Sequence, residues 1–302
     1  MSATLLLIFA VISADPLSPG THRQTLEVDG RTRSFLVHVP SGFDAQQPAA
    51  VVFVLHGAGM NGPWMMWYTG MNAKSDAEGF IAVYPNGTGF GPFRTWNAGG
   101  ITGPMAAGQP DDVAFLSGVI DHLAERAAID EDRIYSTGLS NGGMMSYRLA
   151  AELADRIAAI GPIAGTMTRP DPQPSRPVPV IHFHGTNDRI VPTNGPSPGT
   201  PSFLAFLSVE ETLRSWCVVN DCDLDRPVEV QLPDSANDGT TVVRTTYGPG
   251  PSGAEVVFVS IQNGGHTWPG RWSLLHLITG KSTQDISAND LLWEFFERHP
   301  RP

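Results

Sequence analysis

Apolar and polar residues alternate on both sides of Asp29-Gly30, over the stretch TLEVDGRTRSFLVHVP. This period of two residues is the period of a β-strand, because successive side chains point to opposite faces of a sheet. Asp-Gly is also a favoured two-residue turn between paired strands. The pattern therefore predicts an antiparallel hairpin near the start of the chain.

From residue 50 onward the pattern changes to short, continuous apolar runs, which are typical of strands buried on both faces of a parallel sheet. The expected strands cover residues 50–55, 80–84, 133–137, 158–163, 178–183 and 256–261. Helical spacing of apolar residues predicts helices over residues 112–126, 141–153, 203–216 and 290–298, the first with Asp111 or Asp112 as N-cap. This alternation predicts an α/β fold with a mostly parallel central sheet, helices on both faces and ligands at the carboxyl ends of the strands.

The N-terminus carries an apolar run from Thr4 to Ile12, followed by the small residues Ser13 and Ala14. The run is too short to span a bilayer and resembles a signal peptide, although no Lys or Arg precedes it. We expect residues 1–14 to be a signal peptide and residues 15–302 to form one domain, because no repeat or long linker interrupts them. A secreted or periplasmic protein is predicted.

Charge and cysteine content exclude several classes of function. The formal net charge is −11, and no cluster of Lys and Arg suits a phosphate backbone, so we expect no nucleic-acid partner. No other segment has membrane-spanning length. Cys217 and Cys222 are too few for a zinc site, and an uninterrupted helix would hold them too far apart for a disulfide, so we interpret them as structural and leave the disulfide open.

Two segments match the G-x-S-x-G pattern of serine nucleophiles, around Ser140 and around Ser197. Ser140 follows an expected strand and precedes an expected helix, which would project its hydroxyl from a tight turn. Ser197 stands between two prolines, in a loop that can begin neither element. We therefore expect Ser140 to be the nucleophile and Ser197 to lie in a surface turn.

A serine hydroxyl needs a base, and in folds with such a turn the acid and then the histidine follow the serine in the chain. His266 follows Gly264-Gly265 after the last expected strand, and Asp188 follows the strand 178–183, so we expect them as base and acid. His182 and His184 share one face of an expected strand, where packing is a commoner role than metal binding. We expect His276 to pack against its apolar neighbours and His299 to lie at a solvated terminus. We expect no metal and no cofactor.

The oxyanion of an acyl-transfer intermediate needs hydrogen-bond donors. The strand 50–55 ends in the glycine-rich turn around Ala58, and Asn141 begins the helix after Ser140. We predict the backbone N–H groups of Ala58 and Asn141 as donors; an ordinary β-turn at Ala58 is the alternative.

The motifs together resemble a known family. LHGAG, YPNG, TWNAG, DDVAF, GLSNGGMMSYRLA, HGTNDRIVP, GGHTWPG and WEFFERHP stand in the order found in polyhydroxybutyrate-depolymerase-like and feruloyl-esterase-like secreted esterases. The resemblance covers most of the chain after residue 14. It implies an α/β-hydrolase fold, Ser140, Asp188 and His266 as a catalytic triad, and Ala58 with Asn141 as the oxyanion hole.

The resemblance also implies residues around the cleft. Trp96, Asn97, Asp111 and Asp112 would line or brace it, whereas their residue types alone indicate a loop aromatic and helix caps. Trp268 joins Trp64, Trp67, Tyr68 and Trp96 as aromatic side chains suited to stack on a substrate or to pack together. The cysteine that relatives often carry before GAEVVF is missing here, which makes Cys217 an alternative partner for Cys222.

These features predict a serine carboxylic ester hydrolase that acts through an acyl-enzyme. Expected substrates are short hydroxyacid esters or feruloyl and acetyl esters, as small molecules or oligomers from polysaccharide or polyester. Acyl transfer to a sugar or lipid alcohol would use the same residues. A non-catalytic binding protein with this fold is the third alternative, although such proteins normally lack a member of the triad. The sequence leaves the natural ester and the oligomeric state open.

Overall fold

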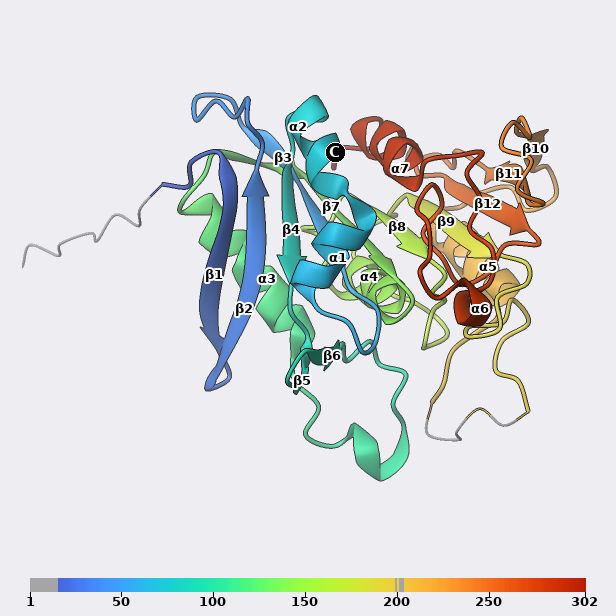
Figure 1. Cartoon of the computed structure of the whole chain (residues 1–302), viewed down its shortest axis with the longest axis horizontal. Helices are drawn as coiled ribbons and strands as arrows, with labels where there is room; N and C mark the ends of the chain where they lie inside the picture. The colour runs from blue at the N-terminus through green and yellow to red at the C-terminus, as the bar shows by residue number, and fades with distance from the viewer. Residues whose placement is uncertain (1–15, 199, 201–203) are drawn as a thin grey trace, which may run out of the picture.

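A computed structural model describes residues 16–198, 200 and 204–302 of the chain. The signal peptide expected over residues 1–14 lies outside the described residues. Within them, ten strands form one sheet with helices on both faces, and two short strands form a separate pair (Figure 1). The sheet contains β1 (Gly20–Val28), β2 (Arg31–Val39), β3 (Ala49–Leu55), β4 (Ile81–Pro85), β7 (Ile129–Leu139), β8 (Ala159–Ile163), β9 (Val180–Gly185), β10 (Val228–Gln231), β11 (Thr241–Tyr247) and β12 (Val256–Gln262); the pair is β5 (Thr88–Phe90) and β6 (Phe93–Thr95).

The sheet has a parallel centre and antiparallel edges. The strand order is β1-β2-β4-β3-β7-β8-β9-β12-β11-β10, and every neighbouring pair from β4 to β12 is parallel. β1 and β2 form the predicted hairpin, and both turn residues, Asp29 and Gly30, have positive φ angles, as a type I′ turn requires. The predicted mostly parallel sheet and N-terminal hairpin are confirmed.

The helices divide between the two faces of the sheet (Figure 1). One face is covered by α1 (Gly62–Thr69), α2 (Met71–Glu78) and α7 (Ala288–Glu297), the other by α3 (Asp112–Ala124), α4 (Asn141–Glu152) and α5 (Val209–Val219). A short helix, α6 (His276–Thr279), and a 3-10 turn (Gly103–Ala106) lie in connecting loops. In the described part of the chain, none of these helices combines the length and apolar character needed to cross a membrane.

Strand β3 explains how one apolar run supports two cores. Val51 and Phe53 belong to the core beneath α3, α4 and α5, whereas Val52 and Val54 belong to the core beneath α1, α2 and α7. All seven residues of β3 are buried, because helices cover both faces of this central strand. The continuous apolar run therefore indicates a central position in the sheet, and the carboxyl end of β3 leads directly to the site.

The helix expected from residue 203 begins later, at Val209. Ser208 and Glu211 form a capping box, in which each side chain accepts a hydrogen bond from the backbone of the other residue, and this fixes the start of α5. The amide of Ala205, before the cap, instead donates to the carbonyl of Gly100. The predicted start was wrong because a loop contact and the cap override the apolar spacing.

Candidate active site

Ser140 stands on a sharp turn between β7 and α4, with φ of 56° and ψ of −120°. This positive φ is uncommon for a residue with a side chain, and such strain gathers at functional sites. The turn depends on glycine at both flanks. A Cβ on Gly142 would collide with the backbone of Leu55, and a Cβ on Gly138 would collide with Gly142. Ser197, in contrast, lies outside every helix and strand.

Asp188 and His266 are joined by a hydrogen bond of 2.7 Å from His266 Nδ1 to Asp188 Oδ2. Asp188 follows β9 and His266 follows β12, so two neighbouring parallel strands bring them together. The other carboxylate oxygen, Oδ1, accepts the amides of Ile190 and Val191 at 2.8 and 2.9 Å. The imidazole is therefore oriented by a carboxylate whose two oxygens have separate partners.

The carboxyl group of Asp188 is buried and still ionised. Burial alone would raise its pKa, but the hydrogen bond from His266 and the electrostatic interaction with that ring lead the contributions that outweigh burial, so the pKa of Asp188 lies below its ordinary value. The amide of Val191 contributes in the same direction. An ionised carboxylate at this point favours an Nδ1–H imidazole and stabilises its cation.

Ser140 and His266 line one cavity of about 530 Å³. Among the described residues, no hydrogen bond joins their side chains. Catalytic hydrogen bonds are often long before a substrate binds, so this geometry leaves the pair available for catalysis. None of the residues that line the cavity is Asp, Glu, Lys or Arg: Gly57, Ala58, Gly59, Met60, Asn61, Trp64, Trp67, Tyr68, Pro92, Phe93, Leu139, Ser140, Ile190, His266, Ser273, Leu274, Leu275 and Thr279.

Two backbone amides beside Ser140 have no hydrogen-bond acceptor within the described residues, those of Ala58 and Asn141. Ala58 lies in the turn after β3 and lines the cavity. Asn141 is the first residue of α4, and its side chain is held by Thr95 and by the backbone of Trp96. The helix dipole adds positive character at this end of α4. Both amides are thus available to a negatively charged oxygen.

A match to a known protein family shows which class of enzyme carries this arrangement of residues. Residues 43–212 match the family model described as phospholipase/carboxylesterase. The chain belongs to this family. The protein is therefore a carboxylic ester hydrolase. This activity agrees with a serine on a strand-to-helix turn and a histidine beside an acid.

The relatives agree with the family. A putative esterase, NocK, from Nocardia uniformis is 31% identical over 97% of this chain and 88% of its own length. Feruloyl esterase C from Emericella nidulans is 27% identical over 92% of this chain and 90% of its own. An acetyl xylan esterase structure from Aspergillus awamori has a TM-score of 0.62 at 15% identity, covering 92% of this chain and 99% of that one, which shows a shared fold. The predicted feruloyl-esterase-like family and α/β-hydrolase fold are confirmed.

Trp96 and Asn97, which were predicted to bind substrate, lie behind the cavity of this esterase and do not line it. Trp96 is buried and donates from its indole nitrogen to the carbonyl of His56, next to the turn that holds Ala58. Asn97 donates to the carbonyl of Pro110 through its side-chain amide. Their contacts fit the bracing role that the family resemblance also implied.

Asp111 and Trp268 likewise do not line the cavity. Asp111 is the N-cap of α3, and Trp268 is fully buried with its indole nitrogen donating to Asn289. The neighbouring Asp112 makes a buried ion pair of 2.6 Å with Arg33. It also accepts a hydrogen bond from the backbone N–H of Asn97, so it fixes the loop directly after Trp96. The prediction that Asp111 and Trp268 contact substrate gains no support from these positions.

The cavity wall includes residues that the sequence patterns did not single out. Ile190, Leu274 and Leu275 line it from loops, and Phe93 lines it from the short strand β6. Trp64, Trp67 and Tyr68, which the sequence offered only as aromatic candidates, line it from α1. Trp64 stacks on Tyr68 at 5.1 Å between ring centroids. The sequence signal that could have identified Leu274 and Leu275 as wall residues is their position in the loop that also carries His266, between β12 and α6.

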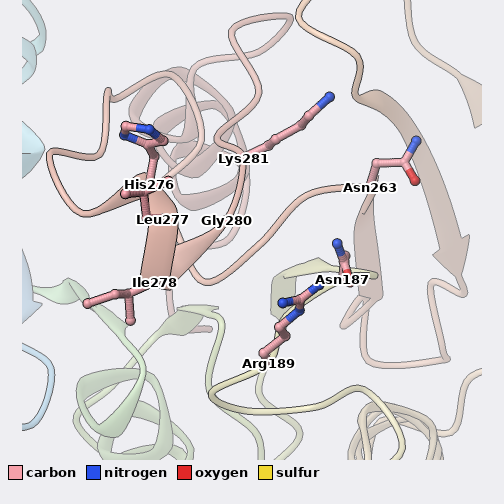
Figure 2. A pocket seen from close by; sticks show the side chains of 8 residues that line it. All are labelled: Asn187, Arg189, Asn263, His276, Leu277, Ile278, Gly280 and Lys281. Carbon is pink, nitrogen blue, oxygen red and sulfur yellow. The ribbon is translucent and has the colours of Figure 1, made fainter.

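Another cavity, of about 450 Å³, is lined by residues of α6 and of the loop after β9 (Figure 2). Figure 2 shows Asn187 and Arg189 from the loop after β9 across from the α6 segment, while the Lys281 side chain extends toward a different end of the cavity. The Lys281 ammonium donates to the carbonyls of Asp238 and Gly239. The two cationic side chains of this cavity, Arg189 and Lys281, therefore do not converge on one point.

Cys217 and Cys222 are both free thiols in the structure. Helix α5 ends at Val219, and Asp221 has a positive φ of 54°, so the chain reverses and brings Cys222 back toward Cys217. The predicted obstacle, an uninterrupted helix between them, is therefore absent. A hydrogen bond with Cys222, together with burial, raises the pKa of the Cys217 thiol far above its ordinary value.

Proposed function

We propose that this protein is a serine esterase in which Ser140 attacks the ester, His266 acts as base and Asp188 orients the imidazole. The observation that carries the proposal is the convergence of the Ser140 turn and the His266–Asp188 hydrogen bond of 2.7 Å on one cavity. The backbone N–H groups of Ala58 and Asn141, which have no acceptor among the described residues, support the stabilisation of an oxyanion.

The reaction would proceed in two halves through an acyl-enzyme. His266 Nε2 takes the Ser140 hydroxyl proton as the oxygen attacks the ester carbonyl, and the alkoxide leaves with that proton. Water then attacks the acyl-enzyme with His266 again as base, which releases the acid and restores Ser140. The amides of Ala58 and Asn141 would donate to the carbonyl oxygen when it becomes negative in each half.

The cavity favours uncharged, apolar or aromatic esters. Its wall carries Trp64, Trp67 and Phe93 and has no Asp, Glu, Lys or Arg side chain. Apolar walls bind by burial of apolar surface, and aromatic rings add offset stacking. Related proteins named as feruloyl and acetylxylan esterases make a feruloyl or acetyl ester the first substrates to test, beside short hydroxyacid esters. Secretion through a signal peptide at residues 1–14 is part of the same proposal.

Covalent labelling of Ser140 tests the mechanism. A fluorophosphonate should add one phosphonyl group to the wild type, with the mass assigned by peptide mapping to Ser140, and none to Ser140→Ala. Turnover of para-nitrophenyl acetate and methyl ferulate should fall by at least about 10⁴-fold in Ser140→Ala. Ser197→Ala is the matched control, since it removes the serine of the second G-x-S-x-G segment. Retained turnover in Ser140→Ala, or loss in Ser197→Ala, would overturn the assignment.

A further inference from the structure

Three buried polar side chains form a row that leads to the proposed catalytic acid. The Tyr147 hydroxyl lies 2.9 Å from His182 Nδ1, and His182 Nε2 lies 3.1 Å from His184 Nδ1. His184 Nε2 lies 2.8 Å from the carbonyl oxygen of Val191. Tyr147 comes from α4, the helix that follows Ser140, and the two histidines come from β9, the strand that precedes Asp188.

The last contact fixes the direction of every hydrogen bond in the row. The carbonyl of Val191 can only accept, so His184 must carry a proton on Nε2. A neutral His184 then has a lone pair on Nδ1 and accepts from His182 Nε2–H. His182 Nδ1 in turn accepts from the Tyr147 hydroxyl. The reverse direction would set the lone pair of His184 Nε2 against the oxygen of Val191.

Burial keeps both imidazoles neutral, which this assignment requires. Both rings are enclosed, with exposed fractions of 0% for His182 and 1% for His184. Burial lowers the pKa of His182 well below its ordinary value, and it also lowers the pKa of His184 although Asp188 opposes that change. Tyr147 is equally buried, which raises its pKa and keeps it protonated.

The row ends on the backbone that holds Asp188. The carbonyl oxygen of Val191 accepts a hydrogen bond from His184 Nε2–H, and the backbone N–H of Val191 donates one to Asp188 Oδ1 at 2.9 Å. His184 Nε2 also lies 3.5 Å from Asp188 Oδ2, the oxygen that accepts from His266. The single tautomer of His184 thus presents an N–H, and never a lone pair, to this side of the carboxylate.

We propose that Tyr147, His182 and His184 are positioning residues for Asp188, acting as a one-directional row of neutral donors. The proposal rests on the proposed function of Ser140, His266 and Asp188. None of the three lines the cavity of Ser140, so they have no route to the substrate. Their loss should therefore lower kcat and leave KM within about twofold.

The tautomers can be measured without any activity. Long-range ¹H–¹⁵N spectra of protein labelled on histidine rings distinguish Nδ1–H, Nε2–H and cationic imidazoles, and His182→Gln and His184→Gln assign the signals. We expect neutral Nε2–H forms for both residues in the wild type at neutral pH. In Tyr147→Phe, which removes only the hydroxyl, we expect the His182 signals to shift toward a mixture of tautomers. An Nδ1–H or cationic His184 in the wild type would overturn the proposal.

Kinetics then test whether the row positions the acid or only stabilises the fold. Rates are expressed per site titrated with fluorophosphonate, so that misfolded protein does not count. We expect Tyr147→Phe to lower kcat by roughly three- to tenfold, the equivalent of one hydrogen bond. His184→Phe, which leaves the Val191 carbonyl unpaired, should lower kcat by roughly 10- to 100-fold. His184→Gln, whose amide can still donate, should recover part of that loss.

Ser136→Ala is the matched control, because Ser136 on β7 makes a buried side-chain hydrogen bond of 2.9 Å with Ser146 on α4, the helix that also carries Tyr147. Its kcat per titrated site should match the wild type. An equal fall in Ser136→Ala and Tyr147→Phe, or an unchanged kcat in His184→Phe, would show a purely structural row and overturn the proposal. If Ser140 takes no label, the proposed function fails, and the tautomer spectra still decide on the row itself.

Discussion

Replacing Asp188 with asparagine tests the orienting hydrogen bond most directly, because the two side chains have the same shape. In the wild type, Oδ1 accepts two amides and Oδ2 accepts from His266 Nδ1. Asparagine has one oxygen and one NH₂ group, so it can satisfy only one of these sides.

The backbone N–H groups of Ile190 and Val191 determine which way the asparagine side chain turns. Turning the oxygen toward His266 would set the NH₂ group against the N–H groups of Ile190 and Val191 and would lose two hydrogen bonds, each worth about 1 kcal/mol or more. The variant therefore keeps its oxygen on the amides and presents NH₂ to His266 Nδ1. The imidazole must then carry its proton on Nε2, where it cannot take the proton of Ser140. We expect kcat to fall about 10⁴-fold, which is about 5 kcal/mol of transition-state stabilisation.

The assay is turnover of para-nitrophenyl acetate per folded molecule, with circular dichroism and thermal unfolding as checks on folding. Asp285→Asn is the matched control, since Asp285 Oδ1 also accepts two consecutive amides, those of Ser235 and Ala236, at 2.8 Å each. Within the part of the chain that the structure describes, no histidine ring is among the hydrogen-bond partners of Asp285. The control should keep full activity. A kcat for Asp188→Asn within tenfold of the wild type would refute the assignment of the tautomer.

Three further predictions concern packing, substrate and pH. Gly142→Ala should destabilise the fold by roughly 2 kcal/mol or more in thermal unfolding, because its Cβ meets backbone, whereas Gly42→Ala, with open space around it, should be neutral; equal melting temperatures would contradict this. Trp64→Ala should raise KM for methyl ferulate by roughly five- to tenfold, and Trp272→Ala, outside the cavity, should not; an equal effect of both would contradict an aromatic wall. Burial lowers the pKa of His56 from 6.5 to about 4, so the unfolded state takes up a proton at a higher pH than the folded state. The free energy of unfolding should therefore be full above pH 6.5 and fall by about 3 kcal/mol between pH 6.5 and 4; an unchanged pH slope in His56→Gln would contradict this.

The central strands could be predicted because burial on both faces leaves a continuous apolar run. Residues 50–55 and 178–183 correspond to β3 and β9, and the period-two stretch around Asp29 corresponds to the hairpin. The edge strands β10 and β11 escaped notice, because their side chains are largely exposed or half-buried and carry no such run. The predicted start of helix α5 was too early, because the spacing of apolar residues gives no information about the N-cap at Ser208.

The candidate site divides in the same way. The placement of Ser140, Asp188 and His266 after strands could be predicted since each follows a recognisable strand, and strand ends meet at one edge of a parallel sheet. The wall of the cavity could not, since Leu274 and Leu275 come from a loop and Phe93 from the short β5-β6 pair, and the courses of both segments depend on tertiary contacts. Trp96 and Trp268 illustrate the converse, because an aromatic residue type does not reveal whether its ring faces a cavity or the core.

The left-handed backbone of Ser140 has a consequence for protein engineering. A non-glycine residue in such a conformation costs of order 1–3 kcal/mol, which the rest of the fold must supply. Glycine would relax that conformation, so Ser140→Gly should melt at a higher temperature than Ser140→Ala while both are inert. Selection for thermal stability alone would therefore favour loss of the proposed nucleophile, so engineering of a more stable variant has to measure turnover in every round.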